Sequence, residues 1–243
     1  MAFERINILG VNIDSLTMQQ AVEKCEDLIS ERIPSMVATA NAEMIMRATK
    51  DSELRSILNR SALVVPDGAG TVWAAHHLGC KMPERVAGYD LAQEILKLAP
   101  SKNQRIYFFG GAPEVAEKAR LKAESVYPGI QIVGTRNGFF KPEDESKIVS
   151  EIRKSKPDVL FVALGVPKQE KFIAHHLKKL KVPLCIGVGG TFDVMAGVMK
   201  RAPEWMQKAK LEWLFRGMMQ PTRAGRLMAL PKFVWKVYTQ SKN

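Results

Sequence analysis

The sequence has few cysteines, and none are spaced like the ligands of a metal site or the partners of a disulfide framework. Cys25, Cys80 and Cys185 are odd in number and far apart, and no Cys-x-x-Cys pair occurs. Neither a disulfide framework nor a zinc site is indicated, which is typical of a protein of the reducing cytoplasm. We therefore predict no bound metal and no cofactor.

Long apolar runs are also missing. No run approaches the roughly 18 residues that a helix needs to cross a bilayer. The first residues, Met-Ala-Phe-Glu-Arg, lack the charged-then-apolar pattern of a secretion signal. The expectation is a protein that is neither exported by this route nor transmembrane.

Three nucleotide-binding motifs are absent. There is no G-x-G-x-x-G after the first predicted strand and no G-x-x-x-x-G-K-[ST], which argues against a dinucleotide dehydrogenase and a P-loop NTPase. No Asp-x-Asp occurs either, the pairing with which many sugar-nucleotide enzymes hold a metal on a diphosphate. If a diphosphate binds, arginines or backbone amides must balance its charge.

The pattern that is present is an alternation of strands and helices. The 243 residues, 46% of them hydrophobic, are enough for one α/β domain with an extension. Predicted strands cover 6–10, 36–39, 63–66, 105–109, 130–133, 159–164 and 184–188. Predicted helices cover 17–32, 51–59, 69–78, 90–98, 113–126 and 142–155. A further helix begins at 42, and another follows the stretch 165–170 and runs to about 180. This alternation predicts a Rossmann-like, open, mostly parallel sheet with helices on both faces.

Capping residues fix several of the predicted helix starts. Thr17 with Gln20, and Asp90 with Gln93, have the spacing of capping boxes, and Asn41 is a good N-cap. Asp90 is therefore given a structural role. Pro113 suits the first turn of the helix that follows it.

The stretch 62–70, Ala-Leu-Val-Val-Pro-Asp-Gly-Ala-Gly, is the centre of the functional interpretation. Its Val-rich run without polar alternation is typical of a strand buried on both faces, and Pro-Asp-Gly is a turn. Asp67 should thus lie at the carboxyl edge of the sheet, where open α/β folds bind ligands. It is a candidate general base, although it is also suited to making the turn or capping the next helix.

Small and polar residues follow several other predicted strands on the same edge. They are Thr39, Asn41, Gly110, Gly111, Gly165, Gln169, Gly189, Gly190 and Asp193. Glycines ahead of helices let backbone N–H groups approach phosphate oxygens, so a nucleotide diphosphate is a suitable ligand. Asp193 is a candidate to hold a base or ribose, or to cap a turn. Gln169 also fits as support for its own helix, and Arg85 is a candidate anion contact.

The C-terminal segment differs from the rest. Residues 200–243 hold ten basic and two acidic residues, a net +8 of the chain's +11. We divide the chain into an α/β core, 1–195, and a helical appendage, 196–243, with helices over 203–220 and 221–238. The mixture of aromatic, aliphatic and basic residues is typical of a helix in a membrane interface. Docking on the core or on a second subunit is the alternative.

Five blocks together resemble one family. They are Ala38-Thr39-Ala40-Asn41-Ala42-Glu43, Val65-Pro66-Asp67-Gly68, Pro83 to Asp90 (Pro-Glu-Arg-Val-Ala-Gly-Tyr-Asp), Ala163 to Lys171 (Ala-Leu-Gly-Val-Pro-Lys-Gln-Glu-Lys) and Gly187 to Asp193 (Gly-Val-Gly-Gly-Thr-Phe-Asp). In this order they resemble the WecG/TagA/CpsF glycosyltransferases. Members build bacterial surface polymers at the inner face of the membrane, and the nearest likeness is to N-acetylmannosaminyltransferases of wall teichoic acid synthesis.

The resemblance implies an inverting, metal-independent transfer of N-acetylmannosamine (ManNAc) from UDP-ManNAc to undecaprenyl-diphosphate-GlcNAc, forming a β-1,4 link. It implies that Asp67 is the base and that Thr39, Asn41, Arg85 and Gln169 lie in the active site. Asp193 falls in the nucleotide-binding segment. Three arginines of the appendage would meet the diphosphate: Arg216, Arg223 and Arg226. A different donor, such as UDP-ManNAcA or UDP-glucose in exopolysaccharide synthesis, is the alternative.

Two other classes of protein also fit parts of the pattern. A nucleic-acid-binding protein would explain the basic charge, but no recognition motif appears. A nicotinamide-dependent oxidoreductase would explain the α/β alternation but lacks the glycine fingerprint. The expected partners are therefore a UDP-sugar, a lipid-linked acceptor and an anionic membrane surface, with a homo-oligomer possible in principle and no nucleic acid.

Overall fold

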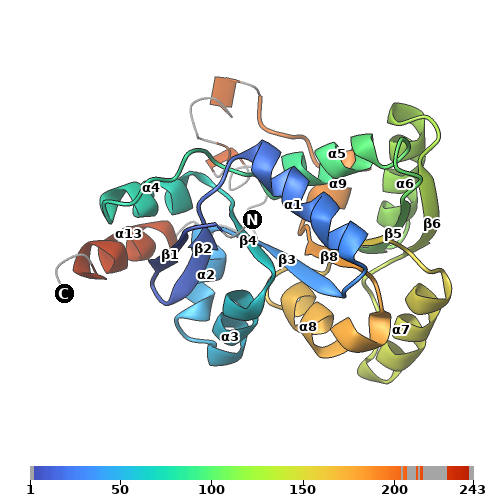
Figure 1. The fold of residues 1–243 in the computed structure, drawn as a ribbon, viewed down its shortest axis with the longest axis horizontal. Coiled ribbons are helices and arrows are strands. Elements are labelled where there is room, and N and C mark those ends of the chain that lie inside the picture. Colours follow the sequence, from blue (N-terminus) through green and yellow to red (C-terminus); the bar gives the residue numbers. More distant parts are fainter. Residues whose placement is uncertain (1–2, 204, 207–211, 213, 216–228, 241–243) are drawn as a thin grey trace.

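Figure 1 shows the computed structural model, which describes residues 3–203, 205–206, 212, 214–215 and 229–240. Its centre is a six-stranded sheet in the order β4-β3-β8-β7-β5-β6, in which every pairing is parallel. The strands are β3 Ser35–Ala40, β4 Leu63–Pro66, β5 Arg105–Gly110, β6 Gln131–Arg136, β7 Val159–Ala163 and β8 Leu184–Gly187. The predicted open parallel sheet is confirmed.

The burial of the strands explains why their sequences lack polar alternation. Strands β3, β4, β7 and β8 are buried along their whole length, as expected where helices cover both faces of a parallel sheet. Strand β6, at the edge of the sheet, is only partly buried. The carboxyl ends of these four strands are therefore fixed in the core of the molecule.

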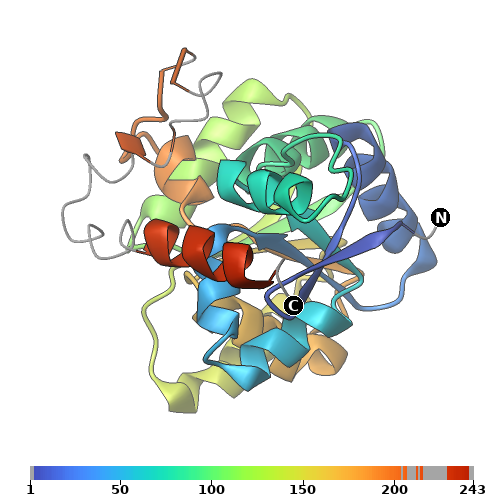
Figure 2. The same cartoon turned by 90° about the vertical axis from the view of Figure 1, so that its left-hand side faces the viewer.

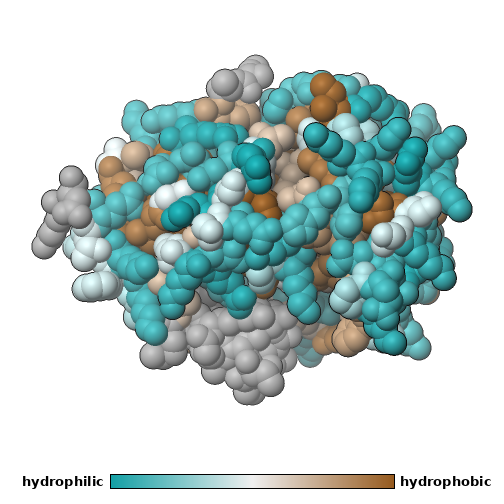
Figure 3. Space-filling model, turned by 90° about the horizontal axis from the view of Figure 1, so that it is seen from below, coloured by the Kyte–Doolittle hydropathy of each residue, from teal (hydrophilic) through white to brown (hydrophobic). Residues whose placement is uncertain are grey.

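Helices cover both faces of the sheet (Figure 1). One face carries α1 Met18–Glu31, α5 Gly88–Leu98, α6 Val115–Val126 and α9 Thr191–Met195. The other carries α2 Ala42–Ala48, α3 Ser52–Arg60, α7 Glu145–Lys154, which a short 3-10 turn at Pro142–Asp144 precedes, and α8 Lys168–Leu180. Viewed from below the layer of α3, α7 and α8, the surface is mostly hydrophilic (Figure 3). These helices thus bury one apolar face each and present the other to solvent.

Two of the predicted caps are confirmed and two helix starts are wrong. Thr17 and Gln20 form the capping box of α1, and Asn41 caps α2 by accepting from Met44 N at 3.0 Å. The box at Asp90 does not form, because α5 already begins at Gly88 and the Asp90 carboxylate instead pairs with Arg201 at 2.7 Å. Pro113 precedes α6 rather than opening it, since a turn through residue 114 comes between them.

The N-terminal strand prediction is also wrong in part. Instead of one strand over 6–10, β1 Arg5–Ile8 and β2 Val11–Asp14 form an antiparallel hairpin outside the main sheet. The turn uses Leu9 and Gly10, both with positive φ, as a two-residue hairpin turn requires. Leu-Gly is not the Asn-Gly or Asp-Gly pair that usually signals such a turn in a sequence. The hairpin is tied to the edge strand β4, because the Asp14 carboxylate accepts from Val64 N at 2.7 Å.

The C-terminal helix, α13 Ala229–Gln240, packs against α2 and against α4 Ala69–His77 (Figure 2). Phe233 and Val237 are fully buried in the core that these helices share. At its end, Gln240 accepts from Leu9 N at 2.8 Å and donates to Asn7 O at 3.1 Å. One face of this helix therefore docks on the core.

The opposite face of α13 is open. Val234 and Trp235 on this face are 39% and 68% exposed. Tyr238 is 49% exposed and lies at its margin, with its ring centroid 4.2 Å from that of His77 and 6.3 Å from that of Trp73 in α4. No helix within the described ranges is long and apolar enough to cross a membrane. The division into 1–195 and 196–243 stays a prediction, and most of the first predicted appendage helix lies outside the described residues.

Candidate active site

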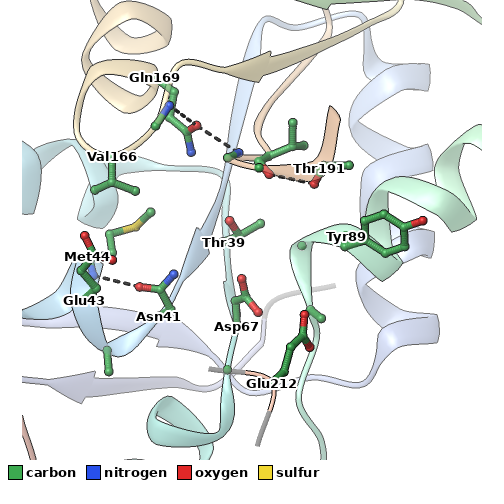
Figure 4. A pocket seen from close by; sticks show the side chains of 18 of the residues that line it. Thr39, Asn41, Glu43, Met44, Asp67, Tyr89, Val166, Gln169, Thr191 and Glu212 are labelled. Carbon is green, nitrogen blue, oxygen red and sulfur yellow. Dashed lines mark hydrogen bonds between the residues drawn. The ribbon is translucent and has the colours of Figure 1, made fainter. Parts of the chain in front are cut away.

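A cavity of about 460 Å³ opens at the carboxyl edge of four neighbouring strands, β4, β3, β8 and β7. The loops that leave these strands form its walls (Figure 4). It brings together most of the residues that the sequence analysis singled out: Thr39, Asn41, Asp67, Arg85, Gly165, Gln169, Gly189, Gly190 and Asp193. The site is thus assembled from segments up to 191 positions apart in the sequence, Thr39 to Leu230.

Asp67 lies directly after β4, where its backbone is tightly held. Its N–H donates to Ala40 O at 3.0 Å, and its carbonyl accepts from the Thr71 hydroxyl at 3.2 Å. The N-cap of α4 is Gly68, with φ +88°, and not Asp67. The carboxylate lines the cavity beside Thr39 and Asn41, as Figure 4 shows. An acid held in this way is suited to taking a proton from a bound hydroxyl group.

Asn41 combines a structural and a cavity-lining role. Its side-chain oxygen caps α2, which fixes the orientation of the amide group. The amide nitrogen is therefore the end that remains to donate towards a ligand. A capping residue was predicted at this position, and the capping bond explains how a short polar side chain is held rigidly at the end of β3.

Arg85 meets a carboxylate at the wall of the cavity. Its Nη1 lies 3.1 Å from Glu212 Oε2, and its Nη2 lies 4.0 Å from Asp90 Oδ2. Asp90 in turn pairs with Arg201, whose guanidinium lies 4.6 Å from the centre of the Tyr89 ring. The arginine expected to contact an anion is thus half-buried and already opposite an internal anion, with which a ligand's phosphates would compete.

The hydroxyl of Thr39 and the side-chain oxygen of Gln169 form hydrogen bonds with backbone groups beneath the cavity. The Thr39 hydroxyl donates to Gly187 O at 3.1 Å. Gln169 Oε1 accepts from Gly165 N at 3.2 Å and from Gly189 N at 3.1 Å. These two side chains therefore shape the floor of the cavity by holding the loops after β7 and β8.

The structure does not bring Gly110 and Gly111 to this cavity. A Cβ on Gly110 would lie 2.4 Å from Ala163 O, and one on Gly111 would lie 2.9 Å from Val115 Cγ1. Close packing at the end of β5 accounts for both glycines, and their role in binding stays a prediction. Gly189 and Gly190 do line the cavity, ahead of the single-turn helix α9.

The three arginines predicted to meet the diphosphate lie outside the described residues: Arg216, Arg223 and Arg226. The segment predicted as an appendage nevertheless reaches the cavity, because Glu212 and Leu230 are among its lining residues. In the part of the chain that the structure describes, no three His, Cys, Asp or Glu side chains gather closely enough to hold a metal ion.

Sequence reasoning missed four polar residues of the site: Glu43, Tyr89, Thr191 and Glu212. Glu212 was counted only as an exception in a basic segment, although an acid among so many bases is a signal of a specific ion pair. Tyr89 and Thr191 line the cavity from the starts of α5 and α9, and both stood inside the family-like blocks without drawing attention.

Comparison with known proteins agrees with the geometry. A model of the glycosyl transferase WecG/TagA/CpsF family matches residues 6–243. An N-acetylglucosaminyldiphosphoundecaprenol N-acetyl-beta-D-mannosaminyltransferase of Bacillus subtilis strain 168 is 35% identical over 98% of this chain and 91% of its own length. A protein of the same name from Staphylococcus aureus strain MW2 is 35% identical over 96% of this chain and 92% of its own length. The chain therefore belongs to the WecG/TagA/CpsF family of glycosyltransferases.

Proposed function

We propose that this glycosyltransferase moves ManNAc from UDP-ManNAc to the GlcNAc of undecaprenyl-diphosphate-GlcNAc, forming a β-1,4 link in the synthesis of wall teichoic acid or a related surface polymer. The observation that carries this proposal is the near full-length identity to relatives whose name states that acceptor and sugar. The cavity supports it, because a carboxylate and an arginine face the same space.

Asp67 is the general base of the proposed reaction. A sugar hydroxyl is too weak an acid to ionise at neutral pH, so a carboxylate that takes its proton during attack on the anomeric carbon speeds the step by about 10² to 10⁴. Attack from the side opposite to UDP turns an α-linked donor into a β-linked product. The fixed backbone of Asp67 supports this role, since it limits where the carboxylate can lie.

Arg85 stabilises the leaving diphosphate in this proposal. Negative charge gathers on the β-phosphate as the sugar bond breaks, and a guanidinium beside it lowers the energy of the transition state. Glu212 holds that guanidinium when no phosphate is bound. No metal takes part, so Arg85, backbone amides and the three appendage arginines carry the charge of the diphosphate.

The enzyme works at the inner face of the plasma membrane, attached peripherally, because its acceptor is a lipid. The open face of α13 supports this, since Trp235 is exposed there and Lys232 is exposed on the same helix. Aromatic rings beside lysines are the composition of a helix that rests in an anionic membrane interface. A contact with a second subunit would use the same face.

The decisive experiment is a donor panel. Release of UDP is measured with UDP-ManNAc, UDP-ManNAcA, UDP-glucose and UDP-GlcNAc, each with and without a short-chain lipid-diphosphate-GlcNAc and in excess EDTA. We expect fast, acceptor-dependent release from UDP-ManNAc that EDTA leaves unchanged. Faster release from UDP-ManNAcA or UDP-glucose would favour the alternative donor. Dependence on added Mg²⁺ would refute the metal-free mechanism.

A further inference from the structure

One side-chain amide joins two loops of the cavity. Gln169, at the start of α8, accepts with Oε1 from Gly165 N in the loop after β7 and from Gly189 N in the loop after β8. Both glycines line the cavity, and both have positive φ, +75° and +53°. The shape of this wall therefore depends on the oxygen of one amide facing two N–H groups.

The neighbouring acid accepts a hydrogen bond from the other end of that amide. Gln169 Nε2 donates to Glu170 Oε1 at 2.7 Å. If the amide were flipped, its NH₂ group would face the two backbone N–H donors, and its oxygen would face a carboxyl oxygen. The two glycine N–H groups would then face another donor, and these part-buried groups would lose their acceptor at a cost of about 1 to 3 kcal/mol each.

Gly187 leaves room for the side chains of Gln169 and Glu170, because it has no side chain of its own. A Cβ on Gly187 would lie 2.6 Å from Gln169 Nε2 and 3.1 Å from Glu170 Oε1. The Gly187 carbonyl, in turn, accepts from the hydroxyl of Thr39. The central strand β8 is thus built with a glycine where the amide and the acid need space.

Glu170 itself is a costly residue for the fold. It is fully buried, and no group of the residues that the structure describes forms a hydrogen bond with its second oxygen, Oε2. Burial is the main reason that the pKa of its carboxyl rises to about 7. A buried carboxyl with one unsatisfied oxygen destabilises a folded protein, so a stabilising role in the fold does not account for its presence.

We propose that Glu170 is a positioning residue of the active site, which fixes the amide of Gln169 so that its oxygen holds the loops of Gly165 and Gly189 in their ligand-binding form. Glu170 touches no ligand in this account and acts only through Gln169. This proposal rests on the proposed function in one respect only, which is that UDP binds in this cavity.

The direct test measures hydrogen exchange at the backbone amides of Gly165 and Gly189 in the full chain, with NMR as the readout. In Glu170→Leu, which removes the acceptor but keeps an apolar filling, we expect the amides of Gly165 and Gly189 to exchange at least about tenfold faster than in the wild type. Glu170→Gln keeps an acceptor oxygen and should stay within about twofold of the wild type. Loss of protection in Glu170→Gln, or retained protection in Glu170→Leu, would overturn the proposal.

A matched control and a second variant keep the test decisive. Glu151 accepts from the Tyr107 hydroxyl away from the cavity, so Glu151→Leu should leave the two glycine amides unchanged. If Glu170→Leu does not fold, Gln169→Met removes the same hydrogen bonds with an unbranched side chain of similar length. Unchanged exchange at Gly165 and Gly189 in Gln169→Met would refute the role of the amide, and with it that of Glu170.

A binding measurement separates this proposal from the proposed function. We expect Glu170→Leu to weaken UDP binding by about tenfold, and the double variant with Gln169→Met to bind no more weakly than Gln169→Met alone, since both changes break one linkage. Additive losses would contradict action through Gln169. If the wild type binds no UDP, the proposed function fails, while the exchange experiment still decides whether Glu170 positions the loops.

Discussion

Replacing Glu170 by glutamine should change how the stability of the protein depends on pH. Burial raises the pKa of this carboxyl from 4.5 to about 7, against the opposing effects of the hydrogen bond from Gln169 and the positive charge of Arg47. The folded protein therefore keeps a proton that the unfolded chain releases. The stability from this proton is fully present below pH 4.5 and is lost as pH rises towards 7.

The size of the effect follows from the pKa change. One pKa unit corresponds to 1.36 kcal/mol, so between pH 5 and pH 8 the wild type should lose about 2 to 3 kcal/mol of stability through Glu170. A glutamine at this position resembles the protonated acid and cannot ionise. The free energy of unfolding of Glu170→Gln, relative to the wild type, should therefore rise by about 2 to 3 kcal/mol over the same range.

Urea denaturation of both proteins at pH 5, 6, 7 and 8 measures this difference, and titrations of all other groups cancel in the comparison. Glu114→Gln is the control. Lys118 lowers the pKa of the Glu114 carboxyl, so that group is ionised in both states over this range and its difference should be flat. A flat difference for Glu170→Gln as well would refute the reasoning, because it would mean that burial does not hold the proton.

Three further predictions address the site and the C-terminal helix. Asp67→Asn should lower turnover by at least about 10² and leave UDP affinity nearly unchanged, since an amide fills the same space but takes no proton; near-normal turnover would remove the base role. Glu212→Gln should tighten UDP binding measured by calorimetry, because phosphates would no longer compete with a carboxylate for Arg85, and weaker binding would contradict that competition. Phe233→Ala should cost about 3 to 5 kcal/mol of stability in urea denaturation. Trp235→Ala should cost under about 0.5 kcal/mol of stability but should reduce retention on anionic vesicles. Equal stability losses would refute the assignment of the two faces of α13.

The sheet was predictable because its signal is local. Apolar runs such as 63–66 and 159–163 are short and followed by turn residues, which favours strands covered on both faces, and the order of strands and helices then indicates a parallel sheet. Asp67 could be placed at the carboxyl edge for the same reason. The hairpin was missed because Leu9 has a positive φ, which leucine rarely adopts, so its residue type does not indicate a turn.

The contacts of the site were less predictable, because each joins residues far apart in the sequence. Asp90 has the spacing of a capping box, yet Arg201 lies nearby in the fold and the ion pair forms instead. Gln169 was interpreted as a pocket residue or as support for its own helix, and it holds two loops at once. A local pattern gives the type of residue at the edge of the sheet but not which partner it meets.

The C-terminal helix connects the membrane question with the cavity. Leu230 at its start lines the cavity, while Phe233 and Val237 anchor the next turns in the core. Trp235 faces away from that core and is exposed, whereas the half-exposed Tyr238 rests against His77 and Trp73 of α4. A helix with one face in the core cannot leave it without exposing a large apolar surface, at about 1.5 to 3 kcal/mol per side chain. Engagement of a membrane by α13 should therefore occur with the helix docked, which brings the lipid surface to the same side of the molecule as one wall of the cavity.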